Sequence, residues 1–230
     1  MNKGLFIVVL LVFFLYIGSV QAEDLGVVKM PQFEAMYGMK TEWVAEKMVY
    51  NGHPMTIQNF SVHRSAEDVM RHFASRWKVK GHGELKHNRV GEDLTIGYEH
   101  NGYSYSVQAR DVPGGSEGSM VVTRNKEFEQ EPLVFPLYPE AQVVSRIHSI
   151  DMGALSETLT LSTAQSASMI SNWYSSTLSR KGWIAQDTLP STGGGVIAFQ
   201  KGKAQCQLTF IDKSPVRNHQ SMVMIHWIKG

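Results

Sequence analysis

Residues 65–81, SAEDVMRHFASRWKVKG, have a counterpart 101 positions later in residues 166–182, SASMISNWYSSTLSRKG. Both stretches begin with a serine, whose side-chain oxygen can accept a hydrogen bond from the free amides of a helix start, and both end at Lys-Gly, where helices commonly stop. Between these ends, bulky apolar residues recur every four positions and so line one helix face. They are Val69, Phe73 and Trp77 in the first stretch and Ile170, Tyr174 and Leu178 in the second. We therefore predict two equivalent helices, each with one buried face.

The chain around these helices repeats at the same spacing. The matching pairs include Pro31 and Pro132, Tyr37 and Tyr138, Phe60 and Leu161, and Val107 and Leu208. Near the two ends, SMVV at 119–122 matches SMVM at 221–224 with a slip of one residue. Repetition in phase over a whole unit is typical of two copies of one small fold. We predict one copy over residues 23–130 and a second over 131–230, joined by a polar, proline-containing connector.

Strand patterns flank each helix. Residues 44–50 and 55–63 precede the first helix, and residues 94–100 and 103–111 follow it, with apolar and polar positions in alternation. This alternation predicts that Tyr98 and Tyr105 face the core. The Asn101-Gly102 turn between the last two is typical of a tight β-hairpin. The second copy has the same order, and each copy closes on its Ser-Met-Val strand. The predicted class is α+β, with two tandem ββαβββ units, each a mainly antiparallel sheet with one helix packed on it.

The N-terminal residues predict export. Met1-Asn2-Lys3 is a short positive start, Leu5 to Ile17 is almost entirely apolar, and Val20-Gln21-Ala22 ends on a small residue. This is the pattern of a signal peptide at residues 1–22, cleaved after Ala22. A retained membrane anchor is the alternative, but the apolar run is shorter than the roughly 20 residues that a spanning helix needs. We therefore expect a periplasmic protein with no stable membrane span after cleavage.

Charge and cysteine content disfavour several classes of function. The chain has 22 Lys and Arg against 21 Asp and Glu, and removal of Lys3 with the signal balances them. A balanced chain has no overall field to attract nucleic acid, so we expect no nucleic-acid partner. Cys206 is the one cysteine, so it cannot form a disulfide within the chain. Its place in an apparent strand, at the position equivalent to Tyr105, predicts a small buried hydrophobe and no thiol chemistry.

Patterns that carry catalysis or metal binding are weak in this sequence. The nine histidines include no His-Glu-x-x-His motif, and the closest useful pair is His82 and His87. No Gly-x-Ser-x-Gly elbow occurs, and the neighbouring carboxylates Glu67 and Asp68 are explained by a helix start. We predict no catalytic residue, cofactor or metal ligand from these motifs. A site assembled from residues distant in the sequence stays possible.

One local concentration of positive charge stands out. Basic side chains cluster at the end of the first helix and just after it, where the second copy has only Arg180 and Lys181. The predicted partner-binding patch consists of Arg76, Lys78, Lys80, His82, Lys86, His87 and Arg89. A solvated helix end beside the buried Trp77 is the alternative interpretation.

Short motifs in the second copy suggest a family. Tyr138-Pro139-Glu140-Ala141, then Asn172-Trp173-Tyr174 and Lys181-Gly182-Trp183, resemble small exported bacterial envelope modules of unassigned function. Those modules have a Tyr-Pro-Gly-Ala-like start and a helix that ends in Gly-Trp; here Glu140 replaces the usual glycine. The first copy looks like a diverged version. The resemblance implies an accessory domain of assembly or secretion machinery.

Two classes of function follow. The first is a non-enzymatic binding or assembly accessory protein of the bacterial envelope, which presents sheet edges or a groove to an envelope or secretion protein. The second is a hydrolase or a small-ligand-binding protein with a site between the two repeats, where clefts often form.

Overall fold

The structure is a computed structural model that describes residues 29–79, 84–127, 132–151, 154–191, 193–213 and 220–229. The predicted signal peptide at residues 1–22 lies outside this range. So do Lys80 and His82 of the predicted basic patch.

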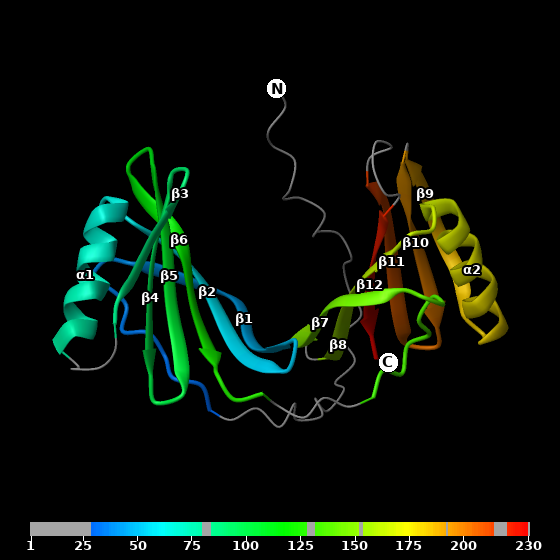
Figure 1. Cartoon of the computed structure of the whole chain (residues 1–230), viewed down its shortest axis with the longest axis horizontal. Coiled ribbons are helices and arrows are strands. Elements are labelled where there is room, and N and C mark those ends of the chain that lie inside the picture. Colours follow the sequence, from blue (N-terminus) through cyan, green and yellow to red (C-terminus); the bar gives the residue numbers. More distant parts are fainter. Residues whose placement is uncertain are drawn as a thin grey trace.

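Within the described residues the chain forms twelve strands and two helices (Figure 1). In chain order they are β1 (Lys40–Tyr50), β2 (His53–Val62), α1 (Ala66–Val79), β3 (Lys86–Val90), β4 (Asp93–His100), β5 (Tyr103–Val112), β6 (Gly115–Arg124), β7 (Gln142–Asp151), β8 (Ala154–Thr163), α2 (Ala167–Arg180), β9 (Ile184–Ser191), β10 (Gly194–Lys201), β11 (Ala204–Lys213) and β12 (Gln220–Ile228). All strands belong to one sheet in the order β3-β4-β5-β6-β2-β1-β7-β8-β12-β11-β10-β9. Every pairing between neighbours is antiparallel.

The prediction of two separate α+β units of ββαβββ order is therefore wrong. The fold is one large antiparallel sheet, and the helices only cover parts of it. Two strands, β3 and β9, were not predicted, because all their residues are exposed and carry no alternation of buried and exposed positions. The pairing of β1 with β7 was not predicted either, because it is made by main-chain atoms.

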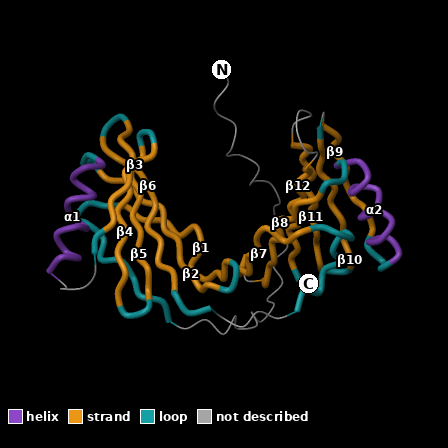
Figure 2. The backbone as a smooth tube through the Cα atoms, in the orientation of Figure 1, coloured by secondary structure: helices purple, strands orange, loops and turns teal. Residues whose placement is uncertain are grey.

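The sheet is bent into a U, with β1 and β7 at its base (Figures 1 and 2). We call β1 to β6 with α1 the first arm, and β7 to β12 with α2 the second arm. Each helix lies on the outer face of its arm. The register of β1 shifts between Trp43 and Ala45, and that of β7 shifts between Val143 and Ser145. Such irregularities increase local bend and twist, so both strands at the base are suited to turning the sheet.

Each arm has its own core between the helix and the sheet. The six apolar residues of the predicted helix stripes are between 0% and 6% exposed, which confirms their buried role. The first core contains Phe60, Val62, Ala66, Val69, Met70, Phe73, Trp77, Ile96, Tyr98, Val107, Ala109 and Met120. The second contains Phe135, Leu159, Leu161, Ala167, Ile170, Tyr174, Leu178, Ile197, Phe199, Cys206, Leu208, Phe210, Val223 and Ile225. Cys206 is buried at 2% exposure, as predicted.

The two helices begin in the same way. Ser65 Oγ accepts the amide hydrogen of Asp68 at 3.1 Å, and Ser166 Oγ accepts that of Met169 at 3.4 Å. A second acceptor comes from the sheet: a carboxylate oxygen of Asp111 lies 2.7 Å from Ala66 N. In the second arm, Asp212 binds Ala167 N at the same distance. These aspartates tie each helix start to a strand of its own arm and add negative charge at the positive end of the helix dipole.

Candidate functional site

The structure separates the described members of the predicted basic patch. Arg76 and Lys78 are exposed in the last turns of α1, and Lys86, His87 and Arg89 are exposed on β3. Arg76 forms an ion pair with Glu34. His87 lies opposite Ile96, a core residue under α1, whereas Lys86 lies opposite Gly97.

Successive side chains of a strand point to opposite faces, and directly paired residues share a face. His87 and Arg89 therefore lie on the helix side of the sheet, and Lys86 lies on the other side. The residues that the structure describes do not form one continuous positive face. Partner binding by this patch stays a prediction.

A cluster of aromatic rings lies where α1 ends over the sheet. Trp77 stacks on Tyr98 with ring centroids 5.1 Å apart and planes at 19°. Tyr98 stacks in turn on His100 at 5.8 Å and 16°. Phe33 meets Tyr105 edge-on at 5.9 Å and Phe73 at 5.8 Å. The cluster thus joins rings from three separate parts of the first arm.

Local sequence explains how these rings come together. Phe73 and Trp77 are one helical turn apart on the buried face of α1. Tyr98 and His100 share a face of β4 because they are two residues apart, and Tyr98 lies directly opposite Tyr105 of β5. Phe33 comes from the segment that precedes β1 and packs against the core of the first arm.

The rings form much of the lining of a partly open cavity of about 190 Å³. Its lining consists of Pro31, Gln32, Phe33, Glu34, Phe73, Arg76, Trp77, Tyr98, His100 and Tyr105. For comparison, an engineered apolar cavity of about 150 Å³ binds benzene, and drug-sized ligands occupy roughly 300–1,000 Å³. The cavity therefore has room for one ring. The two side chains of fixed charge on its lining, Glu34 and Arg76, are paired with each other.

Tyr98 is one of the lining residues, and its hydroxyl is buried without a partner. The residue is 4% exposed, and its hydroxyl oxygen is buried without a hydrogen-bond partner among the described residues. A buried polar group left unpaired costs about 1–3 kcal/mol. Burial raises the pKa of Tyr98 above the ordinary value. The hydroxyl therefore keeps its proton at neutral pH and can donate it in a hydrogen bond.

Tyr105 has a similar electrostatic environment. Burial raises the pKa of its hydroxyl, and the neighbouring Tyr98 and Tyr103 add to the shift. Both tyrosines that line the cavity are therefore neutral near pH 7. Neither can act as a phenolate nucleophile or base at this pH, because burial disfavours the charged phenolate form.

The equivalent positions of the second arm are packed with apolar side chains. Phe199 and Cys206 form the cross-strand pair that corresponds to Tyr98 and Tyr105, at the same spacing of 101 residues. Leu178 stands where the first arm has Trp77. All three residues belong to the core of the second arm. At these three positions of the cavity lining, the two arms differ.

A second, shallow depression lies beside α1 in the first arm. It has a volume of about 360 Å³ and is lined by Met36, Arg64, Asp68, Arg71, His72 and Ser75. Asp68 and Arg71 are paired at 2.8 Å. Burial lowers the pKa of His72, Arg76 lowers it further, and Glu34 partly offsets both. Because this depression is open to solvent, it offers a weaker grip on a ligand than the ring-lined cavity.

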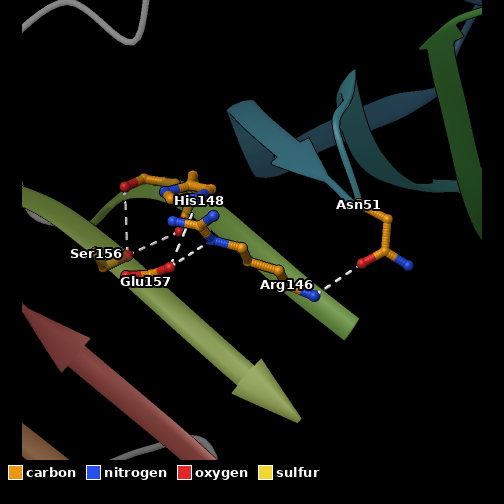
Figure 3. A network of polar contacts seen from close by, with 6 residues as sticks. Asn51, Arg146, His148, Ser156 and Glu157 are labelled. Atoms are coloured by element: carbon orange, nitrogen blue, oxygen red, sulfur yellow. Dashed lines mark hydrogen bonds and ion pairs between the residues drawn. The ribbon is translucent and has the colours of Figure 1, made fainter. Parts of the chain in front are cut away.

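A polar network joins the two arms at the base of the U (Figure 3). The main-chain N–H of Asn51 donates to the carbonyl of Arg146 at 2.9 Å, and the Asn51 side-chain oxygen accepts the Arg146 N–H at 2.8 Å. Nε of Arg146 lies 2.5 Å from a carboxylate oxygen of Glu157, and Nε2 of His148 lies 3.7 Å from the same oxygen. The Ser149 and Ser156 hydroxyls are 2.8 Å apart.

This network is best explained as a structural joint. Its opposite charges, Arg146 and Glu157, satisfy each other, and both side chains are less than 10% exposed. It extends the three-residue pairing of β1 with β7 by one turn residue. None of its residues lines either depression described above. A site between the two repeats stays a hypothesis.

Other histidines bind neighbouring strands or loops. His63 Nδ1 lies 2.8 Å from the Gly114 carbonyl, and His226 Nδ1 lies 2.9 Å from the Thr158 hydroxyl. Across the described ranges, no group of three or more His, Cys, Asp or Glu side chains is placed to hold a metal ion. Neither of the two described helices combines the length and the apolar character needed to cross a bilayer.

Sequence reasoning predicted that Tyr98 and Tyr105 face the core but missed the cavity. Phe33, Glu34 and His100 were not predicted to join them. A useful signal was present in the comparison of the two copies, since Tyr98 and Tyr105 correspond to Phe199 and Cys206. A hydroxyl that one copy has and the other replaces with an apolar group is not required by the shared fold.

Comparison with known proteins gives one partial match. A family model described as START domain-like matches residues 144–220. The match runs from within β7 to the first residue of β12. No curated protein and no solved structure matches the chain. The similarity to a START-like domain therefore concerns the second arm.

Proposed function

We propose that the protein is a non-enzymatic binding protein, exported to the bacterial periplasm, that serves as an accessory to an envelope or secretion system. Its first arm holds a protein partner by taking one aromatic side chain of that partner into the ring-lined cavity. The observation that carries this proposal is the cavity itself: about 190 Å³, with walls made by Phe33, Trp77, Tyr98 and Tyr105. Aromatic anchors in fitted pockets commonly supply most of the energy of a protein interface.

The surroundings of the cavity support capture of a partner rather than catalysis. Arg76 and Glu34 are engaged with each other, and the tyrosine hydroxyls are neutral. Exposed basic residues, Lys78 on α1 and His87 and Arg89 on β3, lie on the same arm and the same side of the sheet. Such charges increase the rate of encounter with an acidic partner without being part of the anchor.

A free small ligand is the second candidate for this cavity. The START domain-like match favours it, because that description denotes a ligand-binding fold. The match covers the second arm, however, whereas the cavity lies in the first. A partner side chain also suits a volume that admits only one ring, and we therefore prefer the protein partner.

Site-specific photo-crosslinking in the native envelope tests this function. A photoreactive residue replaces Lys78, which is exposed on α1 near the cavity, and in a matched control it replaces Ser179, the equivalent exposed residue of α2. We expect a defined protein adduct from position 78 but not from position 179. Millimolar p-cresol, which imitates a tyrosine side chain, should displace it. Equal adducts from both positions, or an adduct that p-cresol leaves unchanged, would contradict the proposal.

A further inference from the structure

The two end strands of the sheet differ in how well their outer edges are protected. Among the described strands, β3 and β9 each have a neighbour on one side only. The open side of such a strand can pair with another chain, and charged side chains on a short strand discourage this. β3 has five residues, among them Lys86 and Arg89. β9 has eight residues, all of them exposed, and its one charged residue is Asp187. The edge of the second arm is therefore the one open to pairing.

The inner face of the sheet, which is the concave side of the U, is apolar at this edge (Figure 2). Leu189 of β9 lies opposite Val196, whose neighbour Ile197 points into the core under α2. Leu189 and Val196 therefore face away from the helix. At the equivalent positions, 101 residues earlier, the first arm pairs Asn88 with Thr95. The shared fold thus accepts polar residues here, and the apolar pair is particular to the second arm.

Ile184 lies on the same face as Leu189. It is opposite Gln200, the neighbour of the core residue Phe199. In a regular strand, two residues five positions apart point to opposite faces. A shift in register between Ile197 and Phe199 brings both side chains to the inner face. They are 66% and 68% exposed, so β9 presents two large apolar groups to solvent on one side.

The chain already contains a junction between two sheet edges. β1 and β7 are equivalent strands of the two repeats, and they pair antiparallel. Met48 lies directly opposite Ser149, its own counterpart 101 residues later. Antiparallel pairing of a strand with its equivalent is the arrangement that a two-fold axis produces. The repeating unit is therefore suited to joining a copy of itself edge to edge.

We infer that β9 pairs antiparallel with β9 of a second copy of this chain, with Ile184 of each copy opposite Leu189 of the other. Residues that pair directly share a face, so this register gathers the four apolar side chains on the inner face. It places Asp187 opposite Gln186, which keeps the two carboxylates from facing each other. Pro190 has no N–H to donate, and it lies just outside the six paired residues.

The assembly closes at two copies. Once the β9 edges are paired, the outer edges that remain are the two β3 strands with their Lys86 and Arg89 charges. One strand makes a small interface, so we expect a reversible dimer that forms at high protein concentration. This inference is independent of the ring-lined cavity, because no residue of β9 lines it.

Sedimentation velocity of the mature protein, from about 1 µM to about 1 mM, tests the dimer. The mass should rise from one chain to two. Ile184→Lys and Leu189→Glu each place a charge opposite an apolar side chain twice per dimer, so each should weaken association about 10-fold or more. Val90→Lys is the matched control, because Val90 is 67% exposed on the inner face of β3. It should leave association unchanged.

The double variant Ile184→Lys with Leu189→Glu tests the register. Opposite charges then face each other in both pairs, so the dimer should return. All substituted positions are exposed, so the variants should fold, and circular dichroism checks this. A single-chain mass at every concentration would overturn the inference. So would a dimer that neither single variant weakens. If the single variants weaken the dimer and the double variant fails to restore it, the proposed register is wrong.

Photo-crosslinking identifies what covers β9 in the native envelope. A photoreactive residue at position 189 should give an adduct with the mass of two chains, and one at position 90 should not. An adduct with a different protein would overturn the second copy as the occupant, in favour of a partner that adds its own strand to the edge.

Discussion

Replacing Glu157 with glutamine removes one charge from a buried ion pair of the second arm, beside the β1–β7 pairing, and should destabilise the protein strongly. Arg146 and Glu157 are 9% and 5% exposed as side chains, and Nε of Arg146 lies 2.5 Å from the carboxylate. With Glu157→Gln, the guanidinium stays buried without its counter-charge. Breaking a buried pair in this way typically costs about 3–5 kcal/mol. We expect a loss of that size in the free energy of unfolding, measured by urea titration of the mature protein.

The first arm contains a matched control. Arg110 and Glu117 are also an Arg–Glu pair on neighbouring strands, with contacts of 3.0 and 2.6 Å, but their side chains are 54% and 44% exposed. Water screens such a pair, so Glu117→Gln should change stability far less than Glu157→Gln does. The two substitutions alter the same chemical group and differ mainly in burial.

A double variant separates the charge from the packing. Arg146→Met with Glu157→Leu removes both charges and keeps bulk in the joint, so most of the stability should return. Hydrogen exchange should locate the single-variant loss at the Asn51 amide, which binds the Arg146 carbonyl. Equal destabilisation by Glu157→Gln and Glu117→Gln would refute the view that burial makes the Arg146–Glu157 pair costly to break.

Two further predictions concern the helix starts and the tyrosines. Asp111→Ala should lower the free energy of unfolding by about 0.5–2 kcal/mol, because Ala66 N loses its acceptor. Asp212→Ala should cost more, because the oxygen that binds Ala167 N also accepts the Ser221 hydroxyl at 2.7 Å. Urea titration checks this with the exposed Asp187→Ala as control, and a larger loss for Asp111→Ala would contradict it. Burial raises the pKa of Tyr98, Tyr105 and Tyr174 above the ordinary value of 10.0, so their neutral forms stabilise the fold below pH 10 and this contribution is lost as the pH rises above it. In a pH titration, the tyrosinate absorbance of these residues at 295 nm should therefore rise only as the protein unfolds. Full, reversible ionisation of all tyrosines near pH 10 in the folded protein would contradict this prediction.

The candidate site was only partly predictable. Strand alternation placed Tyr98 and Tyr105 toward the core, and helical spacing did the same for Phe73 and Trp77. These patterns could not predict that Phe33 joins the cluster, because that residue precedes β1 and reaches the cluster through packing. It also could not distinguish a filled core from a cavity. That difference depends on how the volumes of side chains from separate elements add up in space.

The sequence by itself determined the two helices, their serine starts and their buried stripes, because these depend on contacts within a few residues and on the helical period. It also determined the strands that alternate between buried and exposed positions. Only the tertiary structure decided that all twelve strands share one sheet. The contact between the arms is the main-chain pairing of Met48, Val49 and Tyr50 with β7, extended by the main-chain and side-chain groups of Asn51. Every residue other than proline carries the same main-chain donor and acceptor, so this pairing leaves no side-chain pattern to read.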